Sequence, residues 1–339
     1  MKPLVVTVDP GNIDEERIKE AADIIKRGGL VAFPTETVYG LGANALDSRA
    51  AAGIFSAKKR PLDDPLIVHI SRMADLERLT LEVPDKAKKL IDKFWPGPLT
   101  VVLKKTALVP DIVTTGLGTV AVRMPSGSVA LRLIELSGTP IAAPSANLFG
   151  KPSPTSAAHV AFDLGSDVDM IIDGGETDIG IESTVVAFDG DEAVVLRPGG
   201  TTVEEIEKVI GKIKVLSFDA NASECPGKYP QHYSPDAEVV LVPAGMDQAE
   251  KVRHLAEDLK KSGRRAGIMC VREHESFYKG DGIKVLGPKD DAKICASNLF
   301  RIFREFDREG YNVIIAEGIN EKNLGLAVMN RIRKACGVF

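Results

Sequence analysis

The stretch FPTETVYGLGANA, from Phe33 to Ala45, decides how the first half of the chain is interpreted. An expected apolar strand at 30–33 runs directly into a proline, two threonines, a glutamate and a tyrosine, followed by two glycines. A plain hairpin would place Gly and Asn in the turn and then return to alternating hydrophobic residues. This segment instead places four side chains with hydroxyl or carboxylate groups just past a strand, where ligands gather in α/β sheets.

The composition is typical of a soluble globular protein with more than one core. The chain has 339 residues, of which 44% are hydrophobic and 27% charged. This length fits two domains better than one. The net charge of -5 disfavours broad nonspecific nucleic-acid binding, which needs a basic surface, although a local basic pocket is compatible with it.

We expect a cytoplasmic chain with no membrane role. The opening residues MKPLVVTVDPG hold only a brief apolar run before proline and glycine, which favours a first strand over a signal peptide. No apolar run approaches the roughly 20 residues of a membrane span. The four cysteines form no C-x-x-C pair, so buried reduced thiols are favoured over a zinc site or a disulfide framework.

The order of elements predicts a mixed α/β sheet followed by a small separate unit. In the first part, strands outnumber helices and hairpin-like pairs occur, which favours a mixed sheet over a strictly alternating parallel one. Residues 219–237 carry three prolines and no helical or strand period, as in a linker. Strands and helices then alternate as in a Rossmann-like unit of parallel strands. We therefore predict domains at 1–217 and 238–339, joined by a linker at 218–237.

Several common catalytic and nucleotide-binding motifs are absent from the sequence. No Gly-Lys pair is followed by Ser or Thr, which excludes a Walker A loop. Neither Gly-Leu-Gly triplet completes the G-x-G-x-x-G fingerprint, so dinucleotide binding loses its main support. The absence of G-x-S-x-G and H-E-x-x-H motifs disfavours serine hydrolases and zinc proteases.

Three cationic positions suit an anionic ligand. Lys58 and Arg60 lie just past an expected helix, on a loop stiffened by Pro61 and Pro65. This pair suits a bound anion, but taken alone it favours a solvated basic helix end. Arg123 lies inside the apolar strand TVAVRMP, so its charge needs a ligand or, as an equal alternative, a structural salt bridge.

Other polar residues at strand ends are individually weak signals. A lone histidine such as His69, in LIVHI, is more often a satisfied core residue than a catalyst. Ser145 and Asn147 follow an apolar strand, where a serine commonly caps a turn. Ser183 starts a strand and Arg197 ends the next one. Together, cations, hydroxyls and glycine backbone without a nucleophile–base pair favour a site for a polyphosphate and a small polar molecule.

Several strings resemble, in order and spacing, the YrdC-like family of L-threonylcarbamoyladenylate synthases. They are FPTETVYGLG, K-x-R-P with DDPL and IVHI, the arginine of TVAVRMP, PSAN, ESTVV and LRPG, and they lie within residues 12–201. The linker PGKYPQHYSP and the alternating unit after it resemble the longer two-domain form of this family.

The resemblance implies an enzyme, a nucleotidyltransferase that condenses L-threonine, bicarbonate and ATP to L-threonylcarbamoyl-AMP and diphosphate. It also implies a twisted mixed sheet around a basic cavity, with Mg²⁺ held mainly by the ATP phosphates and no dedicated metal-binding residues. A downstream threonylcarbamoyl transferase complex would use the product to modify tRNA. Direct tRNA binding by this chain is left open.

The resemblance further assigns roles to individual residues. Asp64 stands where the family usually has Asn, and a carboxylate there would repel phosphates unless it faced Mg²⁺ or a base amine. Catalytic roles fall on Lys58, Arg60, Ser145 and Asn147; L-threonine binding on Thr37, His69, Arg123, the backbone of Ala143, and Ser183; ATP binding on Arg60, Asp64, Thr119, Ser145, Ser153 and Arg197, with His232 and Tyr233 reaching from a linker that covers the site.

Two further alternatives follow from the sequence. A basic concavity could take double-stranded RNA, but the acidic net charge weighs against this. Residues 238–339 show no glycine fingerprint and no convergent polar set, so we expect a regulatory or partner-docking unit without catalysis. Glu36 has three candidate tasks: it could orient Thr37 or Lys58, or accept the substrate amine.

Overall fold

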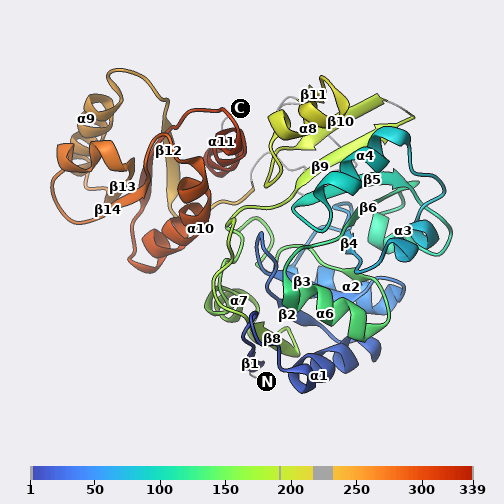
Figure 1. The fold of residues 1–339 in the computed structure, drawn as a ribbon. Coiled ribbons are helices and arrows are strands. Elements are labelled where there is room, and N and C mark those ends of the chain that lie inside the picture. The colour runs from blue at the N-terminus through green and yellow to red at the C-terminus, as the bar shows by residue number, and fades with distance from the viewer. Residues whose placement is uncertain (1–2, 191, 217–231, 338–339) are drawn as a thin grey trace. The chain divides into compact units, whose positions relative to one another are not determined.

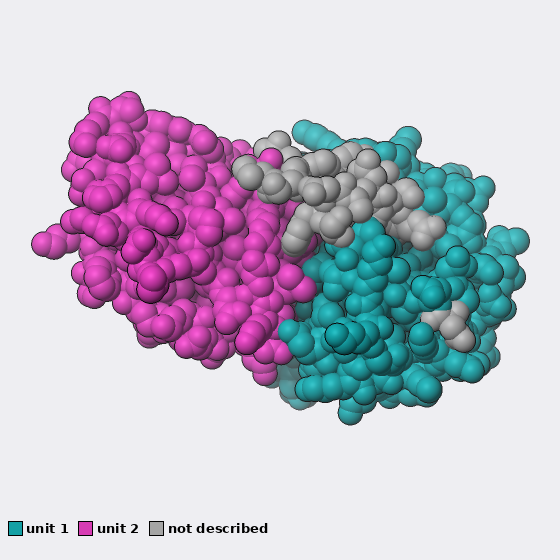
Figure 2. Space-filling model, turned by 90° about the horizontal axis from the view of Figure 1, so that it is seen from above, with its two compact units in different colours: residues 1–149, 153–178, 182–228 teal, residues 150–152, 179–181, 229–339 magenta. Residues whose placement is uncertain are grey.

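The computed structural model describes residues 3–190, 192–216 and 232–337. Most of the expected linker, residues 218–231, lies outside the described residues. The chain forms two compact units (Figure 2). The first contains residues 1–149, 153–178 and 182–228, and the second contains residues 150–152, 179–181 and 229–339.

The first unit is built on a mixed sheet, which confirms the predicted fold class (Figure 1). Its neighbouring strands are parallel in some pairs, such as β4–β6 and β5–β9, and antiparallel in others, such as β5–β6 and β9–β10. The described residues contribute eleven strands in the order β1 (Leu4–Thr7), β8 (Met170–Asp173), β2 (Val31–Phe33), β3 (Gly40–Asn44), β7 (Ile141–Ala142), β4 (Ile67–His69), β6 (Thr119–Arg123), β5 (Leu99–Lys104), β9 (Thr184–Asp189), β10 (Glu192–Arg197) and β11 (Lys214–Val215).

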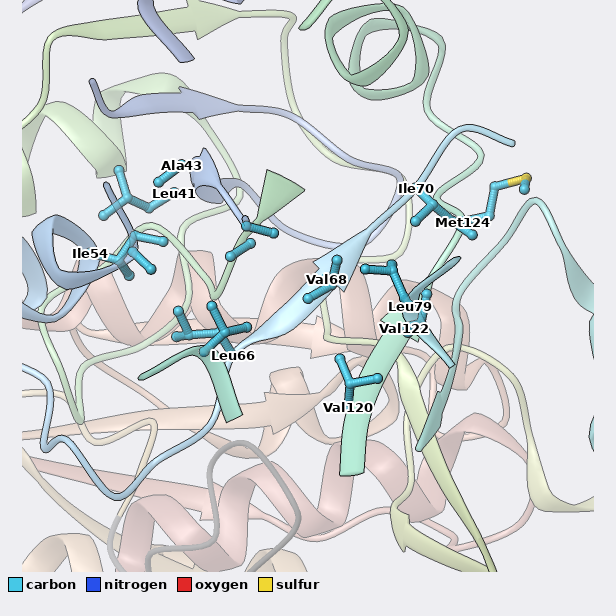
Figure 3. Close-up of a cluster of buried hydrophobic side chains, with 14 of the residues drawn as sticks. Leu41, Ala43, Ile54, Leu66, Val68, Ile70, Leu79, Val120, Val122 and Met124 are labelled. Atoms are coloured by element: carbon cyan, nitrogen blue, oxygen red, sulfur yellow. The ribbon is translucent and has the colours of Figure 1, made fainter. Parts of the chain in front are cut away.

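Helices cover this sheet and bury two apolar clusters. One cluster joins Ile18 of α1 and Leu133 of α6 to Phe33 of β2. The larger cluster contains Leu41, Ile54 and the residues labelled in Figure 3. The helices of the unit are α1 (Glu15–Lys26), α2 (Ser48–Lys58), α3 (Met73–Leu79), α4 (Asp85–Phe94), α5 (Asp111–Thr114), α6 (Ser128–Ser137), α7 (Ala157–Leu164) and α8 (Val203–Ile210).

The stretch from Phe33 to Ala45 is a hairpin after all. Strands β2 and β3 pair antiparallel, with Phe33 opposite Gly40 and Val31 opposite Gly42. A Cβ atom on Gly42 would lie 2.7 Å from the Phe33 ring, so glycine is needed for that ring to pack across β3. The sequence analysis did not predict β3, because glycines are depleted in strands and hide the alternating pattern.

Other differences from the sequence prediction concern short elements. Helices α3 and α5 were not expected, because so few residues carry too little apolar periodicity to indicate a helix. Helix α8 is also short, and its N-terminus is fixed by a capping box between Thr202 and Glu205.

The second unit is a small parallel α/β unit, as predicted. Its strands, counted among the residues that are described, run in the order β12 (Glu238–Val242), β15 (Val313–Glu317), β13 (Ala266–Val271) and β14 (Ile283–Gly287), and every neighbouring pair is parallel. The remaining elements are α9 (Gln248–Lys261), the 3₁₀ helix η1 (Arg272–Phe277), α10 (Ala292–Arg308) and α11 (Leu324–Cys336). None of the helices in the described ranges is both long enough and apolar enough to span a membrane.

We predict that Leu41→Ala lowers the free energy of unfolding of the first unit by about 3 kcal/mol, because Leu41 is fully buried and its truncation leaves a cavity. Urea unfolding followed by the fluorescence of Trp95, the single tryptophan, would measure this change in the unit that contains it. The control is Leu62→Ala, because Leu62 is 68% exposed and its truncation should change stability little. Equal effects of the two substitutions would contradict the assignment of this core.

Candidate functional site

The loop between β2 and β3, residues 34–39, is closed by Thr35. The Thr35 hydroxyl donates to the carbonyl oxygen of Val38 at 2.7 Å and accepts the backbone N–H of Thr37 at 3.2 Å. It also lies 2.8 Å from the hydroxyl of Thr37. This Thr-centred turn fixes the orientation of Thr37, whose side chain is fully buried.

Arg123 is held by three residues from two segments of the first unit. Its Nε donates to the carbonyl oxygen of Gly97 at 3.2 Å, and its Nη1 donates to the Thr37 hydroxyl at 3.0 Å. Its Nη2 lies 2.7 Å from a carboxylate oxygen of Glu36. The salt bridge that the sequence left as an alternative therefore exists, and Glu36, for which this partner was not anticipated, supplies it.

The ionisation of Glu36 follows from this contact. Burial alone would raise the pKa of its carboxyl, but the charge and hydrogen bonding of Arg123 outweigh burial and hold that pKa below its usual value. Glu36 is therefore ionised at neutral pH. The ion pair is also well shielded from solvent, since the Arg123 and Glu36 side chains are only 4% and 7% exposed.

His69 lies beside this pair and is neutral at physiological pH. It is the register partner of Arg123 between β4 and β6. Burial, followed by the Arg123 charge, lowers its pKa to about 3, and the Glu36 carboxylate offsets only part of that shift. Its Nδ1 has no hydrogen-bond partner among the residues that the structure describes. His69 therefore offers an uncharged ring with an unused polar atom next to a buried ion pair.

The strand register aligns His69 and Arg123, both predicted to bind L-threonine, in one row across the sheet. Ile141 of β7, His69, Arg123 and Thr100 of β5 pair successively, and Thr100 then pairs with Val185 of β9. Residues two apart on a strand face the same way. Ser183, two residues before Val185, and Ala143, whose backbone N–H donates to the carbonyl oxygen of Ile67, therefore flank this row beside β9 and β7.

Ser183 connects the row to Arg197, at the end of β10. The Ser183 hydroxyl lies 2.8 Å from that of Thr100, and Arg197 Nη2 donates to the Ser183 hydroxyl at 3.2 Å and to its carbonyl oxygen at 3.0 Å. The turn after Arg197 passes so close that a Cβ atom on Gly199 would lie 2.4 Å from the backbone of Glu182 and Ser183. Only glycine fits there without moving the backbone.

Ser153 belongs to the same region through a carboxylate that the sequence analysis did not assign. Its hydroxyl donates to Glu182, and both side chains are buried. Glu182 lies within the GIESTVV string and directly precedes Ser183. Because Glu182 is adjacent to Ser183 in the sequence, it could have been singled out as a candidate site residue from this string alone.

Lys58 is a buried residue and not a solvated helix end. Its Nζ donates to the carbonyl oxygens of Ser145 and Asn147, each at 2.5 Å, and its side chain is almost fully buried. These contacts tie the end of α2 to the PSAN segment. Three of the four predicted catalytic residues therefore lie together, and the solvated alternative for Lys58 is wrong.

Arg60 and Asp64 form a second buried ion pair. Arg60 Nη2 lies 2.9 Å from the Asp64 carboxylate, and the side chains are 4% and 0% exposed. Arg60 also donates to the carbonyl oxygens of Asp64 at 3.0 Å and Pro65 at 2.8 Å. The carboxylate that replaces the expected Asn is thus compensated within the protein, by a partner that the sequence analysis did not consider.

Thr119 lies at the opposite end of β6 from Arg123. Four residues separate them along the strand, which corresponds to about 13 Å. On the neighbouring β4, Ile67 pairs with Ala121, so the start of β6 faces the segment after Pro65. Of the residues predicted for ATP, Thr119 and the Arg60–Asp64 pair therefore lie toward the end of this strand pair away from Arg123, whereas Arg197 and Ser153 lie near Ser183.

His232 and Tyr233 pack within the second unit. The backbone N–H of His232 donates to the carbonyl oxygen of Lys334 at 3.2 Å. The Tyr233 ring lies 5.6 Å from the ring of Phe300 in α10 and 5.1 Å from the guanidinium carbon of Arg331 in α11. These contacts involve the second unit alone, and the role of the pair in ATP binding stays a prediction.

The second unit does contain a convergent polar set, contrary to expectation. Glu317, fully buried at the end of β15, accepts the backbone N–H of Val271 at 2.8 Å and the hydroxyl of Tyr278. His274 Nδ1 lies 2.8 Å from the same carboxylate. The sequence could not indicate this set, because its members come from two strand ends and η1. The contacts fasten η1 to the edge of the sheet.

We predict that His69 makes the stability of the first unit depend on pH. Its pKa is lower in the folded chain than the usual 6.5, so the unfolded chain binds more protons between pH 6.5 and about 3. The contribution of the neutral His69 to the free energy of unfolding is then fully present above pH 6.5 and is lost as the pH decreases. Between pH 7 and 5 the wild type should lose about 2 kcal/mol more than His69→Gln in urea unfolding monitored by Trp95.

The control for this experiment is His254→Gln, because His254 is exposed in the second unit. It should follow the wild-type pH dependence. Parallel pH curves for the wild type and His69→Gln would show that His69 is not held neutral by the fold.

Comparisons with known proteins agree with this arrangement. The family described as Telomere recombination matches residues 23–199, and the family described as Threonylcarbamoyl-AMP synthase, C-terminal domain, matches residues 201–337. The Threonylcarbamoyl-AMP synthase of Pyrococcus abyssi is 51% identical over 333 residues, covering 96% of this chain and 95% of the relative. The Threonylcarbamoyl-AMP synthase of Bacillus subtilis is 46% identical over 338 residues, covering 98% and 96%.

Solved structures match over almost the whole chain. Pyrococcus abyssi Sua5 complexed with L-threonine has a TM-score of 0.93 and 50% identity, with 98% of each chain covered. A variant of the same protein, in which a histidine and the tyrosine after it are replaced by alanine, has a TM-score of 0.94 and 49% identity, covering 99% of this chain and 96% of that one. These findings confirm both the predicted resemblance and the fold class. The chain belongs to the threonylcarbamoyl-AMP synthase family, in the form with an N-terminal and a C-terminal domain.

Proposed function

We propose that this chain condenses L-threonine, bicarbonate and ATP to L-threonylcarbamoyl-AMP with release of diphosphate, as a nucleotidyltransferase. One observation carries the proposal above all: a protein of the same fold and 50% identity over nearly the full chain forms a complex with L-threonine. The polar residues His69, Arg123 and Thr100 across β4, β6 and β5, with Ser183 beside them, are the part of this chain that suits such a ligand.

In this proposal the threonine carboxylate binds the guanidinium of Arg123, whose planar fork matches a carboxylate. Thr37 and the neutral ring of His69 bind the polar groups of the amino acid, and Ser183 and the backbone of Ala143 complete the set at the ends of the row. A neutral His69 suits this task, because it can exchange a hydrogen bond with a hydroxyl without adding charge to the buried ion pair.

ATP would bind toward Lys58, Arg60 and Arg197. The threonine amine and bicarbonate first form a carbamate with loss of water. A carbamate oxygen then attacks the α-phosphorus of ATP, the bond to the β,γ-diphosphate breaks, and that group leaves with the bonding electron pair. The protein positions the reactants and compensates the charge of the leaving group, which is what phosphoryl-type transfers chiefly require.

Asp64 pairs with Arg60, and, Arg197 apart, the other residues assigned to ATP carry hydroxyl groups or an imidazole ring. Ser145 and Asn147 accept hydrogen bonds from Lys58 through their carbonyl oxygens and would orient its ammonium group toward the phosphates. Thr119 and Ser153 would bind the nucleoside or phosphates from neighbouring segments. His232 and Tyr233 would contribute from the C-terminal side of the linker.

Mg²⁺ would neutralise phosphate charge during this step. Among the described residues, no group of three or more His, Cys, Asp or Glu side chains is arranged to hold a metal ion. Most ligands would therefore come from ATP oxygens and water, as Mg²⁺ prefers. The product would pass to a threonylcarbamoyl transferase complex that modifies tRNA.

The decisive experiment is diphosphate release with each substrate omitted in turn. We expect release only when L-threonine, bicarbonate and ATP are all present, and loss of threonine-dependent release in Arg123→Gln. The control is Arg132→Gln, because Arg132 forms an ion pair of the same 2.7 Å length with Glu15 on the protein surface. Full release without threonine or without bicarbonate would refute the proposed reaction.

We also predict that Asp64→Asn lowers the KM for ATP about threefold to tenfold, because the Arg60 charge is then no longer shared with a carboxylate. The same change should lower the stability of the first unit by about 1–3 kcal/mol, since a buried cation loses its partner. Diphosphate release at varied ATP and urea unfolding would measure the two effects. The neighbouring, exposed Asp63→Asn is the control, and a raised KM for ATP in Asp64→Asn would contradict this account of Arg60.

A further inference from the structure

The contacts of Arg123 leave a defined part of its guanidinium for a ligand. A guanidinium has five N–H groups. Within the described residues, Nε donates to Gly97 and Nη1 donates to Thr37, while Nη2 lies 2.7 Å from the Glu36 carboxylate as an ion pair without hydrogen-bond geometry. Nη1 therefore keeps one N–H and Nη2 keeps both, and N–H groups on two guanidinium nitrogens can bind a single carboxylate together.

The charge of Arg123 is already balanced by Glu36 before any ligand binds. Arg123 and Glu36 are both buried and cancel each other, while the other two groups in contact with Arg123, the Thr37 hydroxyl and the Gly97 carbonyl, are uncharged. His69 is neutral. A ligand that brings only a carboxylate would therefore leave one uncompensated negative charge in a buried environment, close to the carboxylate of Glu36.

A zwitterion avoids this imbalance, because its ammonium group accompanies the carboxylate. We propose that Glu36 makes the Arg123 site selective for ligands that carry an ammonium group beside their carboxylate, and so for an α-amino acid over the same acid without the amine. This specificity role rests on the proposed function, in which L-threonine is the ligand. Glu36 acts here through charge, beyond holding Arg123 in place.

The test compares L-threonine with 3-hydroxybutanoate, which has the same hydroxyl and carboxylate but no amine. Calorimetry on the full chain would give the dissociation constant of each compound, and the relevant quantity is the ratio of 3-hydroxybutanoate to threonine constants. In Glu36→Gln this ratio should fall about tenfold from the wild-type value, because the acid without an amine no longer meets a fixed negative charge. The matched control is Glu15→Gln, which removes the exposed carboxylate that pairs with Arg132 and should leave the ratio unchanged.

The outcomes separate three possibilities. If Glu36→Gln weakens both compounds equally, Glu36 only positions Arg123 and the specificity role is refuted. If the wild type neither binds threonine nor releases diphosphate in response to it, the proposed function itself fails. Should Glu36→Gln not fold, Glu36→Asp keeps the charge at a shorter reach, and its ratio should stay within about threefold of the wild type; a tenfold fall there would also refute the role, because the charge is retained.

Discussion

The first unit depends on how it accommodates the charge of Arg123 near the centre of an apolar sheet. An unpaired guanidinium in that position would cost several kcal/mol. The cost is offset by contacts from the loop 34–39 and from Gly97, two segments that are far apart in the sequence. The same contacts fix the loop, so the loop conformation and the compensation of the Arg123 charge depend on each other. This explains why a hairpin loop carries Thr35, Glu36 and Thr37 where turn residues would otherwise suffice.

The sheet register is what turns scattered motifs into a site. His69, Arg123 and Thr100 come from three separate strings, yet they are neighbours because β4, β6 and β5 pair at those positions. A shift of one residue in any of these strands would move its polar side chain to the opposite face. Ile67, Ala121 and Val102 lie two residues away on the same strands, and with Val185 of β9 they form a small buried cluster of their own. Their packing therefore holds the register on which the polar row depends.

Much of the fold could be predicted from the sequence, but the contacts of the candidate site residues could not. Thr37, His69, Arg123 and Lys58 were singled out as candidates by the strings that resemble a known family. The partners of these residues depend on strand order, which the sequence does not state: Glu36 for Arg123, and the carbonyl oxygens of the PSAN segment for Lys58. The polar set around Glu317 was missed for the same reason, since β13 and β15 become neighbours only through a crossover. Strand β3 was missed for a local reason, namely its glycines.

The two buried ion pairs also bear on how an acidic chain would bind the anionic substrates proposed for it. Arg60 and Arg123 each have a carboxylate within 3 Å, so the charges of these two guanidinium groups are compensated within the fold, while Lys58 is hydrogen-bonded to carbonyl oxygens. A strongly basic site would bind any polyphosphate or nucleic acid, with weak discrimination. When each guanidinium is paired with a carboxylate, the binding of an anion depends on geometry. The anion is bound favourably only where it reaches the N–H groups that the carboxylate does not use. In such a site, removing a carboxylate increases the attraction for anions and decreases the ability to choose among them.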